Sequence, residues 1–364
     1  MAPMNRIIEL SSIIAKETVK LNEYFVDNEL PTPSLDTDAL WSLPIPGAAT
    51  DMEASRVAVI DACSELKALM TGPKALLHFK AGWTAYASVK AILRFKLDRS
   101  FPIGESASFE SMSKFSGLNV KIVRRIVRHA IINHRFFQEK APGVITHSAL
   151  TTVLASDDIM RNSLVVELDE FWPAAVKMAD AMEKWPNSEE NNETGFSLAN
   201  NSDKSMFDIF AEDPERAGRF GMYFSRDKES PNALLDNYPW ASKETIVDVG
   251  GSHGSVAINL AERFPHIKCV VQDLPDTVTE GVSRLPPGLR DRITFMAHDF
   301  FTQQPVTADV YYFRSIFHNW ADKYCIKILQ NLIPALKPGA RILIHERILP
   351  GLETLSTVDA QRTM

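Results

Sequence analysis

The chain of 364 residues has a formal net charge of −7, and 45% of its residues are hydrophobic and 23% charged. These values predict an ordinary globular protein of two domains, and the acidic balance argues against nucleic acid as the main partner. Three widely separated cysteines predict neither a disulfide framework nor a metal site. No apolar run reaches the roughly 18 residues of a membrane span, and no signal peptide precedes the first helix. A cytoplasmic location without membrane attachment is therefore expected.

The first part of the chain predicts long helices. Residues 4–30 carry apolar side chains at helical spacing, and residues 31–53, rich in Pro and Thr, predict an irregular connection. A second helix is expected over residues 54–70 and stops before Gly72. A third long, mostly apolar helix is expected over residues 77–97.

Residues 103–156 follow a different pattern, two short helices and a hairpin, which is a winged-helix layout. The second of these helices carries four cations, Lys121, Arg124, Arg125 and Arg128. A basic recognition helix would suit the major groove of DNA. Because a basic stripe on an exposed helix is more often simply solvated, we predict no nucleic-acid partner.

Residues 157–200 predict a further helix followed by polar sequence. The polar stretch Asn187–Asn201 lacks apolar periodicity and is expected to be a surface loop. Helical spacing resumes over Phe207–Phe224. We predict one domain over residues 1–200 and a second over residues 201–364.

The clearest motif lies in residues 244–275, where a β-branched strand, a glycine-rich turn, a helix and a second strand follow one another. Gly250 and Gly251 let the backbone turn sharply and approach a ligand closely. Asp273 follows Gly250 by 23 residues, a spacing that suits an acid binding both ribose hydroxyls. Asp248, two residues before the first glycine, suits a cationic ligand. The motif predicts a nucleoside site, and the alternative is an ordinary turn of an α/β protein.

Strands and helices continue to alternate to the end of the chain. Strands are expected over residues 293–300, 309–316 and 341–349, with a helix over residues 321–336. Ligands of such parallel sheets bind beyond the carboxyl ends of the strands. That edge is where the sequence places Asp248, Gly250, Asp273, Asp299 and His318.

Residues 244–275 resemble the S-adenosylmethionine-binding motif of class I methyltransferases, D-x-G-x-G-x-G, with Ser252 at the middle glycine. From about residue 6 onward, the chain resembles fungal O-methyltransferases of the sterigmatocystin/caffeic acid type. The resemblance implies an α/β, Rossmann-like class I methyltransferase domain, preceded by a mostly α-helical winged-helix domain. The latter would form a homodimer and cover the substrate. The implied cofactor is S-adenosyl-L-methionine.

The resemblance also assigns a cofactor site. It comprises Asp248, Gly250, Gly251, Asp273, Asp299, Phe300 and Arg314. Asp299 would bond the adenine amino group and Phe300 would pack on the ring. The less favoured alternative is that Asp299 is a loop acid that caps the next element.

A second motif carries the expected catalytic base. The segment from Arg314 to Asp322 resembles K-x-x-L-H-D-W-x-D, whose His is the general base, here His318; Arg314 replaces the Lys, and Asn319 replaces the Asp that follows the His. Glu346 matches the carboxylate that orients this base. Without the resemblance, His318 would more often be structural, and Glu346 could be a surface partner of Arg347.

The substrate-binding residues implied by the resemblance are Phe220, Phe224 and Trp320, of which the two phenylalanines could equally be core. The predicted reaction is methyl transfer to a hydroxyl, expected to be phenolic, of a small secondary metabolite. The methyl of a sulfonium is already activated, so no metal is required. The alternatives are a cyclase or pericyclase on the same scaffold, and a catalytically inactive cofactor-binding homologue. Product mass separates transfer from cyclisation.

Family members continue with a helix and two further strands beyond the position of Met364. The chain is therefore expected to be truncated at its C-terminus and to lack the last two strands of the usual sheet. In that form, the strand over residues 341–349 would have an unpaired edge, which is a liability for aggregation.

Overall fold

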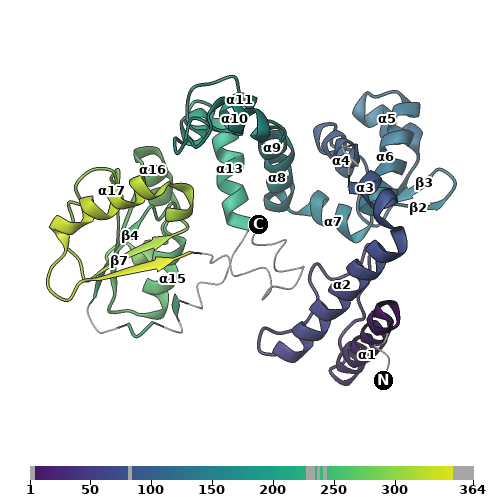
Figure 1. Cartoon of the computed structure of the whole chain (residues 1–364), viewed down its shortest axis with the longest axis horizontal. Coiled ribbons are helices and arrows are strands. Elements are labelled where there is room, and N and C mark those ends of the chain that lie inside the picture. The colour runs from purple at the N-terminus through teal and green to yellow at the C-terminus, as the bar shows by residue number, and fades with distance from the viewer. Residues whose placement is uncertain (1–4, 81–83, 227–233, 236–237, 241–243, 347–364) are drawn as a thin grey trace. The chain divides into compact units, whose positions relative to one another are not determined.

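The computed structural model describes residues 5–80, 84–226, 234–235, 238–240 and 244–346 (Figure 1). By their contacts, the described residues divide into two units. Of the described residues, the first unit holds those up to Glu183 and again Gly195–Arg226; the second holds Lys184–Thr194 and those from 234 to 346. The predicted division at residue 200 stays an interpretation of the sequence.

The first unit is mostly helical. Its helices are α1 (Arg6–Asp27), α2 (Thr50–Thr71), α3 (Pro73–Lys80), α4 (Ala85–Arg94), α5 (Phe109–Ser116), α6 (Val120–His134), α7 (Ala149–Ser156), α8 (Asp158–Val166), α9 (Trp172–Val176), α10 (Met178–Lys184), α11 (Gly195–Ala199), α12 (Met206–Ala211) and α13 (Pro214–Arg226). A π-helical turn, Glu167–Phe171, joins α8 to α9. Helices α1 and α2 pair along their length, with Arg6 held by both carboxylate oxygens of Glu65 at 2.7 and 2.5 Å.

Two predictions, for residues 77–97 and for residues 187–201, are corrected. The helix expected over residues 77–97 is divided into α3, α4 and a 3₁₀ turn, with residues 81–83 outside the described chain. The stretch Asn187–Asn201 is not all surface loop, because α11 lies within it and buries Phe196. A Cβ on Gly195 would lie 2.4 Å from the carbonyl oxygen of Ala174, so the missing side chain lets α11 approach α9 closely.

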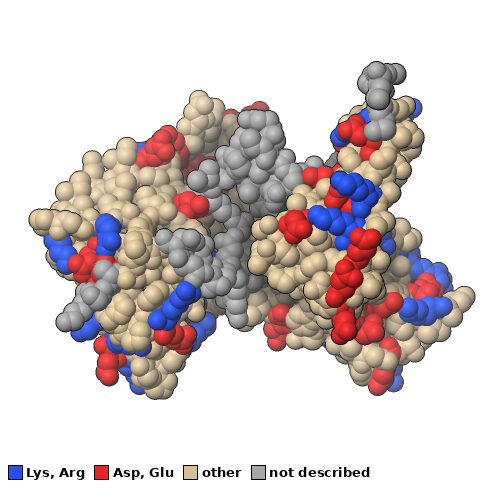
Figure 2. All heavy atoms as spheres, turned by 90° about the horizontal axis from the view of Figure 1, so that it is seen from below, with Lys and Arg blue, Asp and Glu red and all other residues tan. Residues whose placement is uncertain are grey.

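Helices α5 and α6 are followed by a small antiparallel sheet of strands β1 (Ser106–Ala107), β2 (Gln138–Ala141) and β3 (Val144–Thr146), in the order β1-β3-β2. Two of the α6 cations are engaged within the unit. Arg128 bonds both carboxylate oxygens of Glu139 at 2.8 and 2.6 Å, and Arg124 and Arg128 both lie over the ring of Phe109. Acidic and basic side chains are interspersed on the face seen in Figure 2.

The second unit is built on a parallel sheet with helices against it (Figure 1). Its strands are β4 (Thr245–Val249), β5 (Lys268–Asp273), β6 (Ile293–Ala297), β7 (Val310–Arg314) and β8 (Arg341–His345), and its helices are α15 (Ser255–Arg263), α16 (Pro275–Arg284) and α17 (Asp322–Leu332). The order β6-β5-β4-β7-β8 puts the reversal of strand order between β4 and β7. In α/β sheets, ligands bind at such a switch point, beyond the carboxyl ends of the strands.

Two hydrophobic clusters cover the faces of this sheet. Ile246 and Val271 pack with Leu260 of α15, and on the other face Val247 and Phe313 pack with α17. The two central strands are buried on both faces, which explains their nearly continuous apolar sequence. The helix expected over residues 321–336 ends at Leu332, followed by a 3₁₀ turn that contains a proline.

Strand β8 pairs with β7, and among the described residues it has no second neighbour. It ends at His345, four residues before the expected end at Leu349, and residues 347–364 lie outside the described chain. None of the helices that the structure describes combines the length and apolar character that a bilayer span requires.

Candidate active site

The turn after β4 is shaped by two glycines. The amides of Gly250 and Gly251 both donate to the carbonyl of Gln272 on β5, at 2.8 and 3.0 Å. Gly250 has a φ of +70°, and a Cβ there would lie 2.5 Å from Cδ1 of Ile316. A Cβ on Gly251 would lie 2.6 Å from the carboxyl carbon of Asp248. The backbone therefore runs directly against Asp248 and Ile316, as the motif predicts for a ligand-binding turn.

Replacing Gly251 with Ala is expected to lower the free energy of unfolding by about 1–3 kcal/mol, because the added methyl displaces a buried carboxyl group. The measurement is thermal unfolding. The control is Gly288→Ala, where no atom lies within 4 Å of the added Cβ. Equal melting temperatures for the two variants would contradict the prediction.

Asp248 is a buried acid below this turn. It is 3% exposed, and its Oδ2 has no hydrogen-bond partner in the described structure. Burial raises the pKa of this carboxyl to about 7; the charge of Asp273 also raises it and Arg314 opposes the rise. A buried carboxylate without a partner is stabilised by a nearby cation. The site thus fits a positively charged ligand.

Asp273 ends β5 next to the glycine turn. Its Oδ2 accepts from the amide of Ser252 and its Oδ1 from the amide of Leu274, both at 2.8 Å. Desolvation raises the pKa of this carboxyl, and the two amides oppose the rise. Each oxygen has a second lone-pair direction, so the carboxylate, held in one orientation, can still accept from a diol.

Asp299 and Phe300 follow β6. Asp299 is exposed, and its Oδ1 accepts from the amide of Phe301 at 2.9 Å, so one of its two oxygens caps its own loop. Its contact with the adenine stays a prediction. The Cε1 atom of Phe300 is 3.8 Å from the Cβ position of Gly250, and its ring lies edge-on to Trp320. The Phe300 ring therefore borders the glycine turn.

His318 and Glu346 meet at the carboxyl ends of β7 and β8. His318 lies in the 3₁₀ turn Phe317–Asn319, and its Nδ1 is 2.8 Å from Oε2 of Glu346. Oε1 of Glu346 accepts from the amides of Ile316 and Phe317, both at 2.8 Å. Both carboxylate oxygens are thus engaged, and Nε2 is the ring nitrogen left to accept a proton.

The structure places a row of polar side chains on one face of the parallel sheet, and the sequence analysis did not predict this row. Parallel register places Asp248 opposite Tyr312, and Arg314 opposite His345. The hydroxyl of Tyr312 is 2.7 Å from Nδ1 of His345. Burial, and then the charge of Asp248, raises the pKa of Tyr312. Alternate residues of a strand lie on the same face, so the positions that share a face with Asp248 could have been counted from the sequence. The row contains the predicted cofactor residue Arg314.

The three predicted substrate residues lie in different surroundings. Phe220 is 8% exposed, with its ring 4.3 Å from that of Phe210, so core packing describes it. Phe224 lies in α13, and its side chain is outside the described structure. Trp320 lies directly after the turn that carries His318, with its ring edge-on to that of Phe301 at 4.6 Å. Substrate contacts of all three stay predictions.

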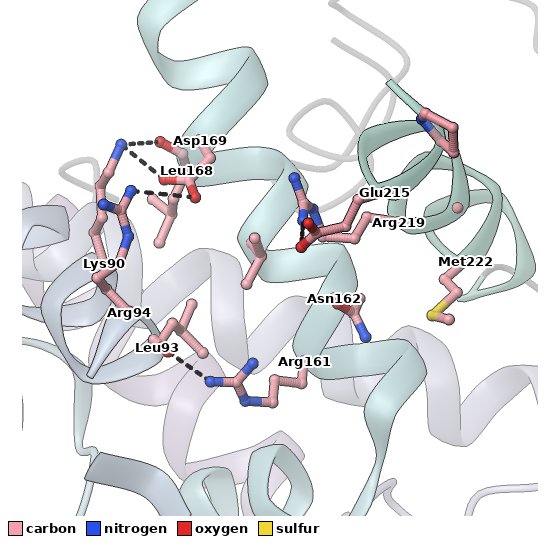
Figure 3. A pocket seen from close by; sticks show the side chains of 13 residues that line it. Lys90, Leu93, Arg94, Arg161, Asn162, Leu168, Asp169, Glu215, Arg219 and Met222 are labelled. Atoms are coloured by element: carbon pink, nitrogen blue, oxygen red, sulfur yellow. Dashed lines mark hydrogen bonds and ion pairs between the residues drawn. The ribbon is translucent and has the colours of Figure 1, made fainter. Parts of the chain in front are cut away.

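The first unit has a separate hollow of about 440 Å³ between α4, α8 and α13 (Figure 3). Its charged side chains have partners within the unit: Lys90 with Asp169 at 2.8 Å, and Arg219 with Glu215 at 2.6 Å. Arg161 donates to the carbonyl of Leu93 at 2.6 Å. We assign this hollow no ligand.

The switch point, the glycine turn, the acid ending β5 and the His–Glu pair together define an α/β methyltransferase domain. A model of the O-methyltransferase domain family matches residues 183–361. O-methyltransferase AMT9 of Alternaria alternata is 38% identical, over 95% of this chain and 83% of the relative. The grayanic acid biosynthesis cluster O-methyltransferase of Cladonia grayi is 39% identical, over 97% of this chain and 75% of the relative. The chain belongs to the fungal class I O-methyltransferases, enzymes that use S-adenosyl-L-methionine.

Solved structures share the fold. OxaC has a TM-score of 0.77 at 22% identity, over 98% of this chain and 87% of that chain. LepI, solved in complex with S-adenosylmethionine, has a TM-score of 0.69 at 25% identity, over 81% of this chain and 79% of that chain. A structure described as a pericyclic reaction enzyme has a TM-score of 0.70 at 25% identity, over 85% of this chain and 82% of that chain.

Proposed function

We propose that the protein transfers a methyl group to a hydroxyl, a phenol in the first instance, of a small secondary metabolite, with His318 as general base. The observation that carries the proposal is the 2.8 Å contact between Nδ1 of His318 and Glu346 at the ligand-binding edge of the sheet. S-adenosyl-L-methionine supplies an activated methyl on its sulfonium. The biosynthetic role of the Cladonia relative supports the substrate class.

The cofactor would be held by the residues around the glycine turn. The turn at Gly250 gives the backbone close access, and Asp273 accepts hydrogen bonds from the ribose hydroxyls. Phe300 and Asp299 bind the adenine from the end of β6. Asp248 and Arg314 set the charge beneath the turn, where the unpaired Oδ2 of Asp248 favours a cation.

The base acts on the acceptor hydroxyl. A phenol has a pKa of about 10 and is mostly protonated at neutral pH. Nε2 of His318 would accept this proton as the oxygen bonds to the methyl. The bond from the methyl to the sulfonium sulfur breaks, a neutral thioether leaves, and Glu346 would hold the resulting imidazolium. The two backbone amides on Glu346 fix the carboxylate, and hence the ring, before the acceptor arrives.

The helical first unit would form the homodimer, with α5, α6 and the small sheet as its winged-helix part. Exposed apolar side chains on α1 and α2 support this; Ile8 is 55% exposed, Val26 64% and Met70 60%. An interface that covers such side chains is stabilised by their burial. Light scattering is expected to give twice the chain mass of 40.7 kDa, and a value of one chain mass would refute the dimer.

The test of the reaction uses labelled S-adenosylmethionine and a panel of fungal phenols, with products examined by mass spectrometry. The proposal expects a product heavier by one methyl group. A product of unchanged mass would instead support the alternative, a pericyclase, which is the description of one structural relative at 25% identity. Cofactor binding without any product indicates an inactive homologue.

A further inference from the structure

A short segment of the chain, residues 184–194, leaves the helical unit and lies against the catalytic unit. It follows α10 and precedes α11, yet its contacts group it with the sheet. We call this segment the strap. It is internally ordered: the hydroxyl of Ser188 bonds Glu193 and accepts from the amide of Glu190 at 3.1 Å, while the amide of Glu193 donates to the carbonyl of Glu190 at 3.2 Å.

Glu190 joins the strap to the first turn of α17. Its Oε1 accepts from Nζ of Lys323 at 2.5 Å, and its Oε2 accepts from the hydroxyl of Tyr324. The bond from Lys323, and next that from Tyr324, holds the pKa of the Glu190 carboxyl below its ordinary value. Glu189 has only a looser contact, 3.6 Å from Lys323.

From Tyr324, contacts lead to the predicted site. The Tyr324 ring lies edge-on to Trp320 at 5.7 Å, and Trp320 in turn lies edge-on to Phe300, the ring beside Gly250. The next residue of α17, Cys325, donates its thiol to the carbonyl of Trp320 at 3.2 Å. The first turn of α17 therefore supports the end of the turn that carries His318.

We propose that Glu190 is a positioning residue for methyl transfer, which holds the first turn of α17 and thereby the ring of Trp320 and the turn of His318. The proposal rests on the function proposed above. Glu190 acts through Tyr324 and touches neither cofactor nor acceptor. The reacting groups require placement within fractions of an ångström, so a small loss of order there lowers the rate.

The test compares Glu190→Ala with Glu189→Ala, which removes the same charge from the same segment. Glu190→Ala is expected to lower kcat about tenfold with little change in the cofactor Kd or the melting temperature, whereas Glu189→Ala stays near wild type. Tyr324→Phe removes only the bond to Tyr324 and keeps the bond to Lys323, so it is expected to lower kcat less than Glu190→Ala does. The double variant is expected to be no worse than Glu190→Ala alone, which already removes that bond. A kcat of Glu190→Ala equal to that of Glu189→Ala overturns the proposal, as does a drop in melting temperature without a change in kcat.

Hydrogen exchange separates failure of this proposal from failure of the proposed function. If wild type transfers no methyl group, the proposed function fails on its own. Exchange is then measured with S-adenosylhomocysteine present: faster exchange in residues 317–325 of Glu190→Ala than of Glu189→Ala supports the strap contact, and equal exchange refutes it.

Discussion

Replacing His318 with Ala is expected to lower kcat by about 10²–10⁴ and to leave the cofactor Kd unchanged. The variant loses the imidazole that accepts the acceptor's proton, while the glycine turn and Asp273 are untouched. The His318 side chain is 48% exposed, so its removal leaves no buried cavity. Single-turnover kinetics with labelled cofactor measures the rate, and calorimetry measures the Kd.

The matched control is His266→Ala, an exposed histidine in the loop before β5, at the edge of the sheet opposite to His318. Glu346→Gln should lower kcat about tenfold or more, because a neutral amide stabilises the imidazolium less than a carboxylate does. If the kcat of His318→Ala equals that of wild type, His318 is not the general base.

Replacing Asp248 with Asn is expected to stabilise the unliganded protein at pH 8 and to weaken cofactor binding about 10–100-fold. The folded-state pKa of about 7 lies above the ordinary value of 3.8. Folding therefore takes up a proton between these values, and wild-type stability falls as pH rises through that window. Above pH 7 the full free-energy cost of burying the ionised carboxylate is present, on the order of 4 kcal/mol. The neutral Asn side chain removes this cost.

Cofactor binding should follow the opposite trend. A cation prefers the ionised acid, so the wild-type Kd is expected to decrease from pH 6 to pH 8, and the Kd of Asp248→Asn to stay flat. Melting temperatures and calorimetry at both pH values measure the two effects, with the exposed Asp276→Asn as control. If Asp248→Asn binds the cofactor as tightly as wild type at pH 8, Asp248 is not its counter-charge.

The local sequence was sufficient to predict the strands and the glycine turn of the second unit. The glycine turn and the apolar strands were predicted because a buried parallel strand and a tight turn each depend on neighbouring residues. Helix boundaries in the first unit were predicted less well. Asn187–Asn201 has no apolar period, yet it contains α11, whose Phe196 is buried by packing that the absent side chain of Gly195 allows.

The amino-acid sequence determined the type of fold and the residues of the candidate site, since spacing along the chain specifies strands, turns and motif positions. Only the tertiary structure decided which of those residues meet. His318 and Glu346 are brought together by the pairing of β7 with β8, and Asp248 faces Tyr312 through parallel register. The contact of Glu190 with α17 joins residues far apart in sequence and depends on packing, which no local pattern records.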